Sequence, residues 1–281
     1  MISLRHLIFF VVITIQVGFG QARYDEGLVP YFEEGHSNLN STLHDQFFEE
    51  VNTKSAIKVK NGQHDMIKKV NPSNYLNEIK TELEKEYPDN RIVNLVFHGH
   101  SVPAGYFKTP IVSTLAAYPA LVLKKIKAQY PFAVVNVIVT AIGGENSIKG
   151  VERFEENVLN HNPDVIFIDY GLNDRGVEIS EAYKAWDKMI RQAKSKNIKI
   201  ILLTPSPDLS VNYSNPENEL KKHSDQIIKL AIDHQVGLVN SYEAFGFLYD
   251  RKNELKKYMS IPNHPNEKGH EIIANEILHW F

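Results

Sequence analysis

The sequence predicts an α/β fold in which a parallel sheet of five strands is covered by helices on both faces. From residue 92 onward, short β-branched runs alternate with amphipathic stretches, and strands separated by helices at this spacing form parallel sheets. The chain has 281 residues, of which 43% are hydrophobic and 23% are charged, which is a normal globular balance. A single α/β domain of ordinary size fits within this length.

The predicted elements follow one another in a regular order. Strands are expected at residues 92–97, 134–139, 164–170, 198–204 and 236–240. Helices are expected at residues 115–129, 148–160, 179–196 and 216–234, and a last helix is expected after Asn266. Because such sheets bind ligands at the carboxyl ends of their strands, the residues just after each run are the first candidates for a site.

The start of the chain has the pattern of a secretory signal peptide. Residues 1–20 combine a basic start, an apolar run over residues 7–17 and small residues at Gly18 and Gly20, with cleavage expected before Gln21. The apolar run is too short for a membrane span of about 20 residues. An N-terminal anchor that is never cleaved is the alternative. We therefore expect a secreted or periplasmic protein without a stable membrane span in the mature chain.

Residues 21–90 are polar and irregular, and we interpret them as an N-terminal extension packed on the main domain at 91–281. Residues 56–62 alternate and end in Asn-Gly, which indicates a small hairpin. Residues 72–86 have apolar side chains at helical spacing.

Composition excludes several classes of protein. Lys and Arg number 31 and Asp and Glu number 34, so the formal net charge is −3 and no nucleic-acid partner is expected. The sequence has no cysteine, which excludes disulfides, thiolate zinc sites and a cysteine nucleophile.

Unusual residues follow the predicted strands. Ser101 lies in a Gly-His-Ser turn after the first strand, where a tight turn can present a hydroxyl to a cleft. Gly143 and Gly144 follow the second strand and let backbone N–H groups approach a ligand closely. Asn173 follows the third strand, and His264 precedes the last helix. Each alone is an ordinary loop residue, but together these types supply the nucleophile, oxyanion donors and base of acyl transfer.

The ordered set Ser101, Gly144, Asn173 and His264 resembles the four blocks of the SGNH hydrolases, the GDSL-type esterases and lipases. The Gly-Leu-Asn-Asp and His-Pro-Asn strings around the last two residues match the family blocks closely, and the resemblance covers about residues 91–281. It implies a three-layer α/β/α sandwich of the flavodoxin-like SGNH hydrolase type. It also implies catalysis by Ser101 and His264 without metal or organic cofactor. The implied oxyanion hole consists of the Ser101 and Gly144 N–H groups and the Asn173 amide.

Two positions depart from the family pattern. The first block usually reads Gly-Asp-Ser, and its middle residue here is His100. The family often has an Asp three residues before the catalytic His, and that position here is Ile261. Because prolines restrict the chain on either side of His264, we expect a backbone carbonyl of Ser260 or Ile261 to accept its Nδ1 proton, which gives a Ser–His dyad. The competing hypothesis is a carboxylate supplied from elsewhere, by Asp174, Asp208 or Asp250.

The resemblance and the export signal favour an exported serine esterase that hydrolyses carboxylic esters through an acyl-enzyme. The expected substrate is an acylated small molecule or polysaccharide, with O-acetyl groups on carbohydrate favoured. A lipid esterase or lipase is one alternative, and a catalytically weak carbohydrate-binding protein on the same fold is another. His100, Tyr106 and Asp174 are the candidates for lining the substrate site.

Two rival interpretations fit the sequence less well. The turn at Ser101 nearly meets the Gly-x-Ser-x-Gly elbow of α/β-hydrolases, but the fifth residue is Pro103 and too few strands precede it. His98 and His100 could form a metal pair at a strand end, but a barrel metal site would need further ligands and eight βα units.

Overall fold

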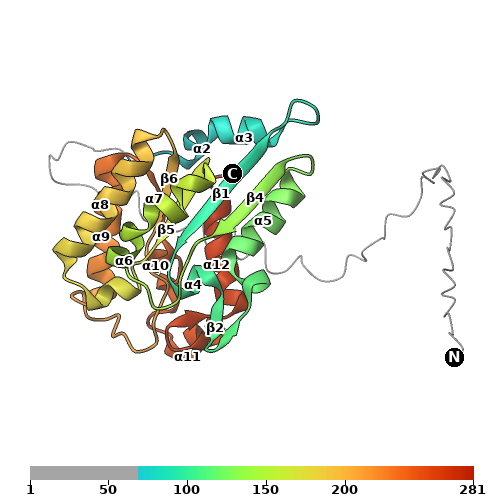
Figure 1. The fold of residues 1–281 in the computed structure, drawn as a ribbon. Coiled ribbons are helices and arrows are strands. Elements are labelled where there is room, and N and C mark those ends of the chain that lie inside the picture. Colours follow the sequence, from blue (N-terminus) through green and yellow to red (C-terminus); the bar gives the residue numbers. More distant parts are fainter. Residues whose placement is uncertain (1–68) are drawn as a thin grey trace, which may run out of the picture. The chain divides into compact units, whose positions relative to one another are not determined.

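The computed structural model describes residues 69–281, and in them a central parallel sheet lies between layers of helices (Figure 1). The expected signal peptide and the hairpin at residues 56–62 lie outside the described residues. The sheet order is β4-β1-β5-β6-β7, and each neighbouring pair is parallel. The strands are β1 (Ile92–Gly99), β4 (Val134–Val139), β5 (Val165–Asp169), β6 (Lys199–Leu203) and β7 (Gly237–Val239). The predicted fold class is confirmed.

Two hydrophobic cores lie on the two faces of the sheet, and the central strands contribute to both. Along β1, Leu95 and Phe97 enter one core while Val96 enters the other. Along β5, Phe167 enters the same core as Leu95, and Ile168 enters the same core as Val96. Successive side chains of a strand point to opposite faces, so this alternation shows that both faces of the central strands are buried.

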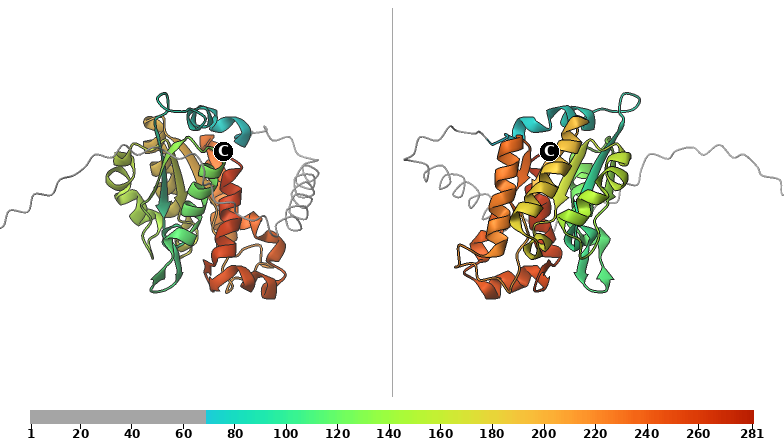
Figure 2. Two further views of the ribbon diagram at one scale, coloured as in Figure 1. Left: turned by 90° about the vertical axis from the view of Figure 1, so that its right-hand side faces the viewer. Right: turned by 60° about the vertical axis from the view of Figure 1, so that its left-hand side comes forward.

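Long helices complete the two outer layers (Figure 2). On one side, α5 (Tyr118–Gln129) packs against α12 (Glu267–Leu278). On the other side, α8 (Ile179–Ser195) packs against α9 (Glu219–His234) and buries Trp186 fully. The helix predicted after Asn266 is confirmed, with the Asn266 side chain accepting from Gly269 N at its first turn.

Shorter elements connect these layers. The short helices are α2 (Pro72–Tyr75), α3 (Asn77–Leu83), α4 (Ser101–Ala104), α6 (Ser147–Glu152), α7 (Phe154–Asn157), α10 (Ser241–Ala244) and α11 (Lys252–Leu255). Two small antiparallel ribbons pair β2 (Tyr106–Lys108) with β3 (Ile111–Val112) and β8 (Met259–Ile261) with β9 (His264–Pro265). The 3₁₀ turns are η1 (Thr114–Ala116), η2 (Leu159–His161), η3 (Asn173–Gly176), η4 (Gly246–Leu248) and η5 (Lys256–Tyr258).

The single helix predicted over residues 148–160 is wrong. The structure divides it into α6 and α7, and the break lies at Arg153, whose backbone leaves the helical region at φ −107° and ψ 7°. The Arg153 guanidinium donates to Thr140 O and is held by Glu145, so the break coincides with a long-range side-chain contact. Hydrophobic spacing alone contains no signal for that contact.

The helical spacing expected at residues 72–86 is confirmed as α2 and α3. Leu76, Ile79 and Leu83 from this segment are buried in the same core as β1 and α12. This part of the expected N-terminal extension therefore packs into the domain.

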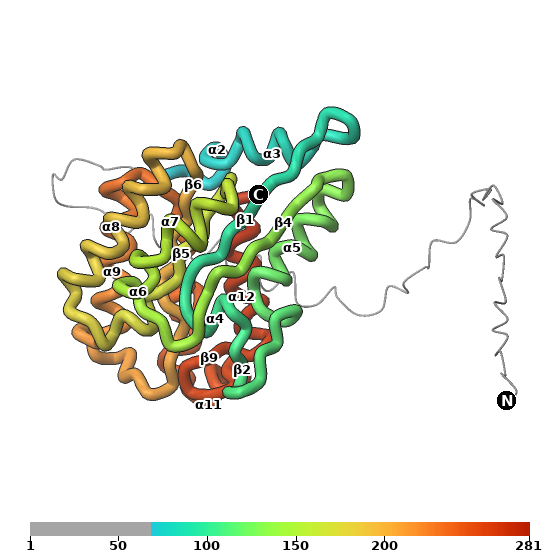
Figure 3. Tube along the Cα trace, in the orientation of Figure 1, coloured from blue at the N-terminus to red at the C-terminus, as the bar shows by residue number. Residues whose placement is uncertain are grey.

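The topology brings the sequence-predicted site residues to one end of the sheet. Ser101 follows β1 and begins α4, and Asn173 follows β5. His264 arrives on β9, which packs against β2 near α4 (Figure 3). Because the carboxyl ends of parallel strands lie at the same edge, residues distant in sequence meet here.

Candidate active site

Ser101 and His264 form a hydrogen-bonded pair at the end of β1. The distance from Ser101 Oγ to His264 Nε2 is 2.7 Å, although 163 positions separate the two residues. Both are nearly buried, with 7% of Ser101 and 8% of His264 exposed. If the hydroxyl donates to Nε2, then the His264 proton lies on Nδ1. A hydroxyl whose proton is directed at a neutral imidazole is an activated nucleophile.

The Nδ1 proton of His264 is accepted by the neighbouring side chain, with Asn263 Oδ1 at 2.9 Å. The expected backbone carbonyl of Ser260 or Ile261 is therefore wrong, although the acceptor is a neutral group as expected. Ile261 pairs with His264 across the β8–β9 hairpin, and Asn263 lies in the turn between them. A short amide side chain in a turn commonly bonds to its close neighbours, which is the local signal that identifies Asn263.

Each of the three competing carboxylates has other partners. Asp174 accepts from Ser147 N at 2.8 Å and from Trp186 Nε1 at 2.7 Å. Asp208 pairs with Arg175 at 2.7 Å. The third, Asp250, lies on the surface and its nearest cation is the adjacent arginine.

Burial lowers the pKa of His264 to about 4. The imidazole is therefore neutral at neutral pH, which is the state that a general base requires.

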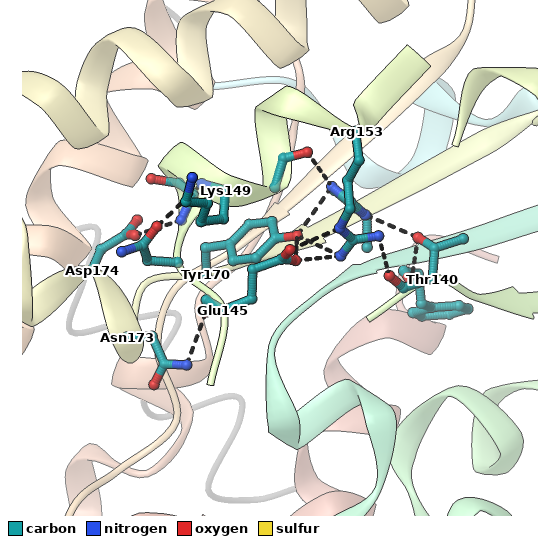
Figure 4. A network of polar contacts seen from close by, with 12 residues as sticks. Thr140, Glu145, Lys149, Arg153, Tyr170, Asn173 and Asp174 are labelled. Atoms are coloured by element: carbon teal, nitrogen blue, oxygen red, sulfur yellow. Dashed lines mark hydrogen bonds and ion pairs between the residues drawn. The ribbon is translucent and has the colours of Figure 1, made fainter. Parts of the chain in front are cut away.

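The expected oxyanion donors belong to two loops that are tied together. Gly144 has φ +80°, a conformation that favours glycine. Asn173 Nδ2 donates to Glu145 O at 2.8 Å, as Figure 4 shows. An amide nitrogen has two N–H groups, so this bond orients the amide of Asn173 and leaves the second donor for a ligand.

A partly buried polar network lies behind the loop that contains Gly144 (Figure 4), and the sequence analysis did not predict it. Arg153 Nε donates to Glu145 Oε1 at 2.8 Å, and Tyr170 OH donates to Glu145 Oε2 at 2.8 Å. Tyr170 OH also contacts His98 Nε2 at 3.0 Å. An ion pair that is shielded from water and hydrogen-bonded on both sides fixes its loop firmly. The only signal for it in the sequence is weak: Glu145 follows Gly144 directly, and a basic residue, Arg153, comes further along the chain.

His98 is part of this network. Its Nδ1 contacts Thr140 Oγ1 at 2.9 Å, and its Nε2 also contacts Gly150 O at 3.1 Å. Burial, followed by the Arg153 charge, lowers the pKa of His98 to about 3, so the ring is neutral. Within residues 69–281, no group of three or more His, Asp or Glu side chains is arranged to hold a metal ion.

The three side chains expected to line the substrate site differ in their positions. His100 and Asp174 are each 0% exposed, so they cannot contact a substrate in this structure, which corrects that expectation. Both instead hold the backbone of the site, because His100 accepts from Val102 N and Asp174 accepts from Ser147 N. Tyr106 is half-buried, and its ring lies against Gly143, next to Gly144. It therefore remains a candidate for lining the substrate site.

A surface pocket of about 480 Å³ adjoins the candidate oxyanion donor Asn173. Its lining combines apolar surface with amide and charged side chains, contributed by the segment after β5 and by the segment that leads into α9. The lining residues are Leu172, Asn173, Arg175, Gly176, Val211, Asn212, Asn215, Asn218 and Glu219.

Residues 97–272 match the GDSL-like lipase/acylhydrolase family. The chain belongs to this family. Membership of the GDSL-like family confirms the resemblance drawn from Ser101, Gly144, Asn173 and His264, and it makes the protein a serine ester hydrolase by family. No curated protein matches the sequence.

Solved structures of esterases share the fold of this GDSL-like protein. A two-domain esterase active on acetylated mannans has 20% identity and a TM-score of 0.60, over 73% of this chain and 52% of that one. The acetyl xylan esterase AlAXEase has 24% identity and a TM-score of 0.57, over 66% and 98% of the two chains. The lipase/acylhydrolase from Enterococcus faecalis has 22% identity and a TM-score of 0.55, over 66% and 93%. This chain thus spans about half the length of the two-domain esterase.

Proposed function

We propose that this protein hydrolyses carboxylic esters through an acyl-enzyme formed on Ser101. The observation that supports this most directly is the 2.7 Å contact between Ser101 Oγ and His264 Nε2 at the carboxyl end of the sheet. Because the pKa of His264 is lowered to about 4, its imidazole is unprotonated at neutral pH and can act as the base.

The mechanism follows from these positions. Ser101 Oγ attacks the ester carbonyl carbon while His264 Nε2 takes the hydroxyl proton. The negative charge that develops on the carbonyl oxygen is held by the N–H groups of Ser101 and Gly144 and by the free N–H of Asn173. The intermediate collapses when His264 returns its proton to the leaving alcohol. A water molecule then attacks the acyl-enzyme, with His264 again as base, and releases the acid.

Asn263 gives this site a neutral third member. Its Oδ1 accepts the Nδ1 proton, which orients the ring and selects the tautomer that leaves Nε2 free. A neutral acceptor stabilises the imidazolium of the transition state less than a carboxylate would. We therefore interpret the centre as a Ser–His dyad with an amide orienter.

The proposed substrate is an O-acetyl group on carbohydrate. The pocket beside Asn173 supports this proposal, because its Asn, Arg and Glu side chains are suited to bind sugar hydroxyls. Two of the similar structures are described as an esterase active on acetylated mannans and an acetyl xylan esterase.

We also propose that the protein is exported, on the strength of the signal-peptide pattern at residues 1–20. Among residues 69–281 no helix has the length and apolarity to cross a bilayer. N-terminal sequencing of secreted protein is expected to begin at or near Gln21. A mature chain that still begins at Met1 would contradict cleavage.

The decisive experiment incubates the purified protein with a panel of acetylated oligosaccharides and measures released acetate. Release is expected from at least one acetylated glycan and is expected to vanish in Ser101→Ala. Saturable glycan binding without any release would indicate the carbohydrate-binding alternative. Release that persists in Ser101→Ala would refute the proposed nucleophile.

A lipid or longer acyl ester is a second candidate, favoured by one observation. The β2–β3 hairpin exposes Ile111 at 59% and Val112 at 44%, and Leu115 just after it at 88%. This hairpin packs by β2 against β9, the strand that contains His264. Comparing kcat/KM for 4-nitrophenyl acetate, butyrate and octanoate decides between the two candidates. A preference that rises with chain length would favour the lipid ester.

A further inference from the structure

His100 occupies the position where the family pattern has Asp, and its ring caps the helix that begins with Ser101. His100 is the N-cap of α4, and its Nδ1 accepts from Val102 N at 3.2 Å. Asp is among the residues preferred at N-caps because its oxygen accepts such a bond, and here an imidazole nitrogen does so. The cap fixes the turn from which the Ser101 hydroxyl projects.

This cap works in only one tautomer of His100. A ring nitrogen that accepts a hydrogen bond has no proton, so the proton of the neutral ring must lie on Nε2. In the other tautomer, Nδ1–H would face the N–H of Val102 and the cap would be lost. This Nδ1–H group would also be directed at Ser101 Oγ, which lies 3.5 Å from Nδ1, and would occupy the oxygen that attacks the ester.

The carboxylate of Asp169 faces the Nε2 atom of His100. The distance from Nε2 to Asp169 Oδ1 is 3.3 Å, although the alignment is not that of an ideal hydrogen bond. Neither atom has another hydrogen-bond partner within residues 69–281, and both side chains are buried. An ionised carboxylate only accepts, so it favours the tautomer with the proton on Nε2.

The fold places Asp169 at this point for structural reasons. Asp169 ends β5 in register with Gly99, and its backbone oxygen accepts from His100 N at 3.2 Å. A Cβ on Gly99 would lie 2.3 Å from that oxygen, so only glycine permits this approach. Tyr118 OH donates to the other carboxylate oxygen at 3.1 Å, which leaves Oδ1 for His100.

We propose that Asp169 is a positioning residue for the nucleophile, because its carboxylate holds His100 in the tautomer that caps α4. The pair His100–Asp169 then performs the capping that a single Asp at position 100 would perform. The inference rests on the proposed function of Ser101 as nucleophile.

A double-mutant cycle on 4-nitrophenyl acetate tests this proposal. Asp169→Asn offers both a donor and an acceptor and no longer selects a tautomer, so kcat is expected to fall about 10- to 100-fold, the loss typical of a misplaced reacting group, with KM nearly unchanged. In the His100→Asp background the new carboxylate caps α4 directly and would repel that of Asp169. There, Asp169→Asn is expected to raise kcat.

Whether Asp169→Asn raises or lowers kcat in the His100→Asp background distinguishes a positioning role of Asp169 from a purely structural one. If Asp169 serves only packing or its bond to Tyr118, then Asp169→Asn lowers kcat by the same factor in both backgrounds, and the proposal is overturned. The matched control is Asp164→Asn, at the opposite end of β5, where the carboxylate accepts from Asn94 N at 2.8 Å. It is expected to leave kcat unchanged. Ester hydrolysis that persists in Ser101→Ala would instead refute the proposed function.

A second measurement tests the proposal without any dependence on catalytic activity. Long-range ¹H–¹⁵N spectra of the histidine-labelled protein report which ring nitrogen of each histidine is protonated, and the His100 signals are assigned from their loss in His100→Asn. Protonation on Nε2 is expected in the unmodified protein. Protonation on Nδ1 of His100 would overturn the proposal.

Discussion

The proposed base side and the proposed oxyanion side of the site are stabilised in different ways. On the base side, His264 is held by single contacts to neutral partners, Ser101 Oγ and Asn263 Oδ1. On the oxyanion side, a partly buried ion pair between Glu145 and Arg153 and several hydrogen bonds hold the loop around Gly144. The imidazole of His264, which changes its protonation in the proposed reaction, therefore has few polar contacts. The proposed oxyanion donors, which must stay aligned, are held from several directions.

The largest effect is expected from removing the base. His264→Ala should lower kcat by on the order of 10⁴- to 10⁶-fold, because Ser101 then lacks a group to take its proton. Steady-state hydrolysis of 4-nitrophenyl acetate measures this, with the melting temperature as the control for folding. A loss of under tenfold would show that another group acts as the base.

Removing a donor on the oxyanion side should have the next largest effect. Asn173→Ala is expected to lower kcat by ~10²–10³-fold, the usual loss for one oxyanion donor, with little change in KM. The N–H that faces the ligand acts chiefly in the transition state, so the split between kcat and KM is the diagnostic readout. A kcat within about threefold of the unmodified protein, far below that expected loss, would contradict the assignment.

Removal of Asn263 is expected to lower kcat by a smaller factor, and this distinguishes the neutral acceptor from a carboxylate that would bind His264 Nδ1. Asn263→Ala is expected to lower kcat about 10- to 100-fold through loss of ring orientation. By comparison, Asp208→Asn and Asp250→Asn should each change kcat by less than ~10-fold. A loss approaching ~10⁴-fold at either aspartate is the scale of a true triad acid and would refute the dyad.

The pH profile sharpens the same comparison. Because the pKa of His264 is lowered to about 4, the acid limb of kcat/KM should fall near that pH. In Asn263→Asp a negative charge beside Nδ1 stabilises the imidazolium, so the pKa of His264 and the acid limb should both move to higher pH. An acid limb near the ordinary histidine value in the unmodified protein would contradict the burial of this ring.

The last prediction concerns stability and not rate. Burial lowers the pKa values of His98 and His270 to about 3, so the folded state keeps both rings neutral while the unfolded state binds protons below pH ~6.5. Their contribution to stability is complete above pH ~6.5 and declines as the pH falls toward 3. The melting temperature should therefore fall between pH 7 and pH 5, before most carboxylates titrate. A melting temperature that is constant over this range would contradict neutral burial.

The sequence predicted the local features of this fold and left the long-range ones unassigned. Alternating hydrophobic runs identify strands because burial imposes a period, and strand ends identify the neighbourhood of the site. The family blocks then predict Ser101 and His264 as the catalytic pair. In contrast, the contact between Arg153 and Thr140 O and the approach of Asp169 to His100 depend on which strands are neighbours. Hydrophobic periodicity does not specify these contacts.

The expectations that Asp174 and His100 line the substrate site are both wrong for the same physical reason. Asp174 and His100 follow strand ends, where ligands bind, but each turns inward to satisfy a backbone N–H. A buried N–H without a partner costs free energy comparable to a lost hydrogen bond, so a nearby polar side chain is used for structure before it is available to a ligand.

Trapping the covalent intermediate tests most directly whether Ser101 is the nucleophile. The protein is mixed with 4-nitrophenyl acetate, quenched in acid during turnover, digested and examined by peptide mass spectrometry. An added acetyl group is expected on Ser101, absent in Ser101→Ala and accumulating in proportion to any burst of 4-nitrophenol. Full turnover without modification of Ser101, or an acetyl group on another residue that turnover requires, would contradict the central claim that Ser101 is the nucleophile.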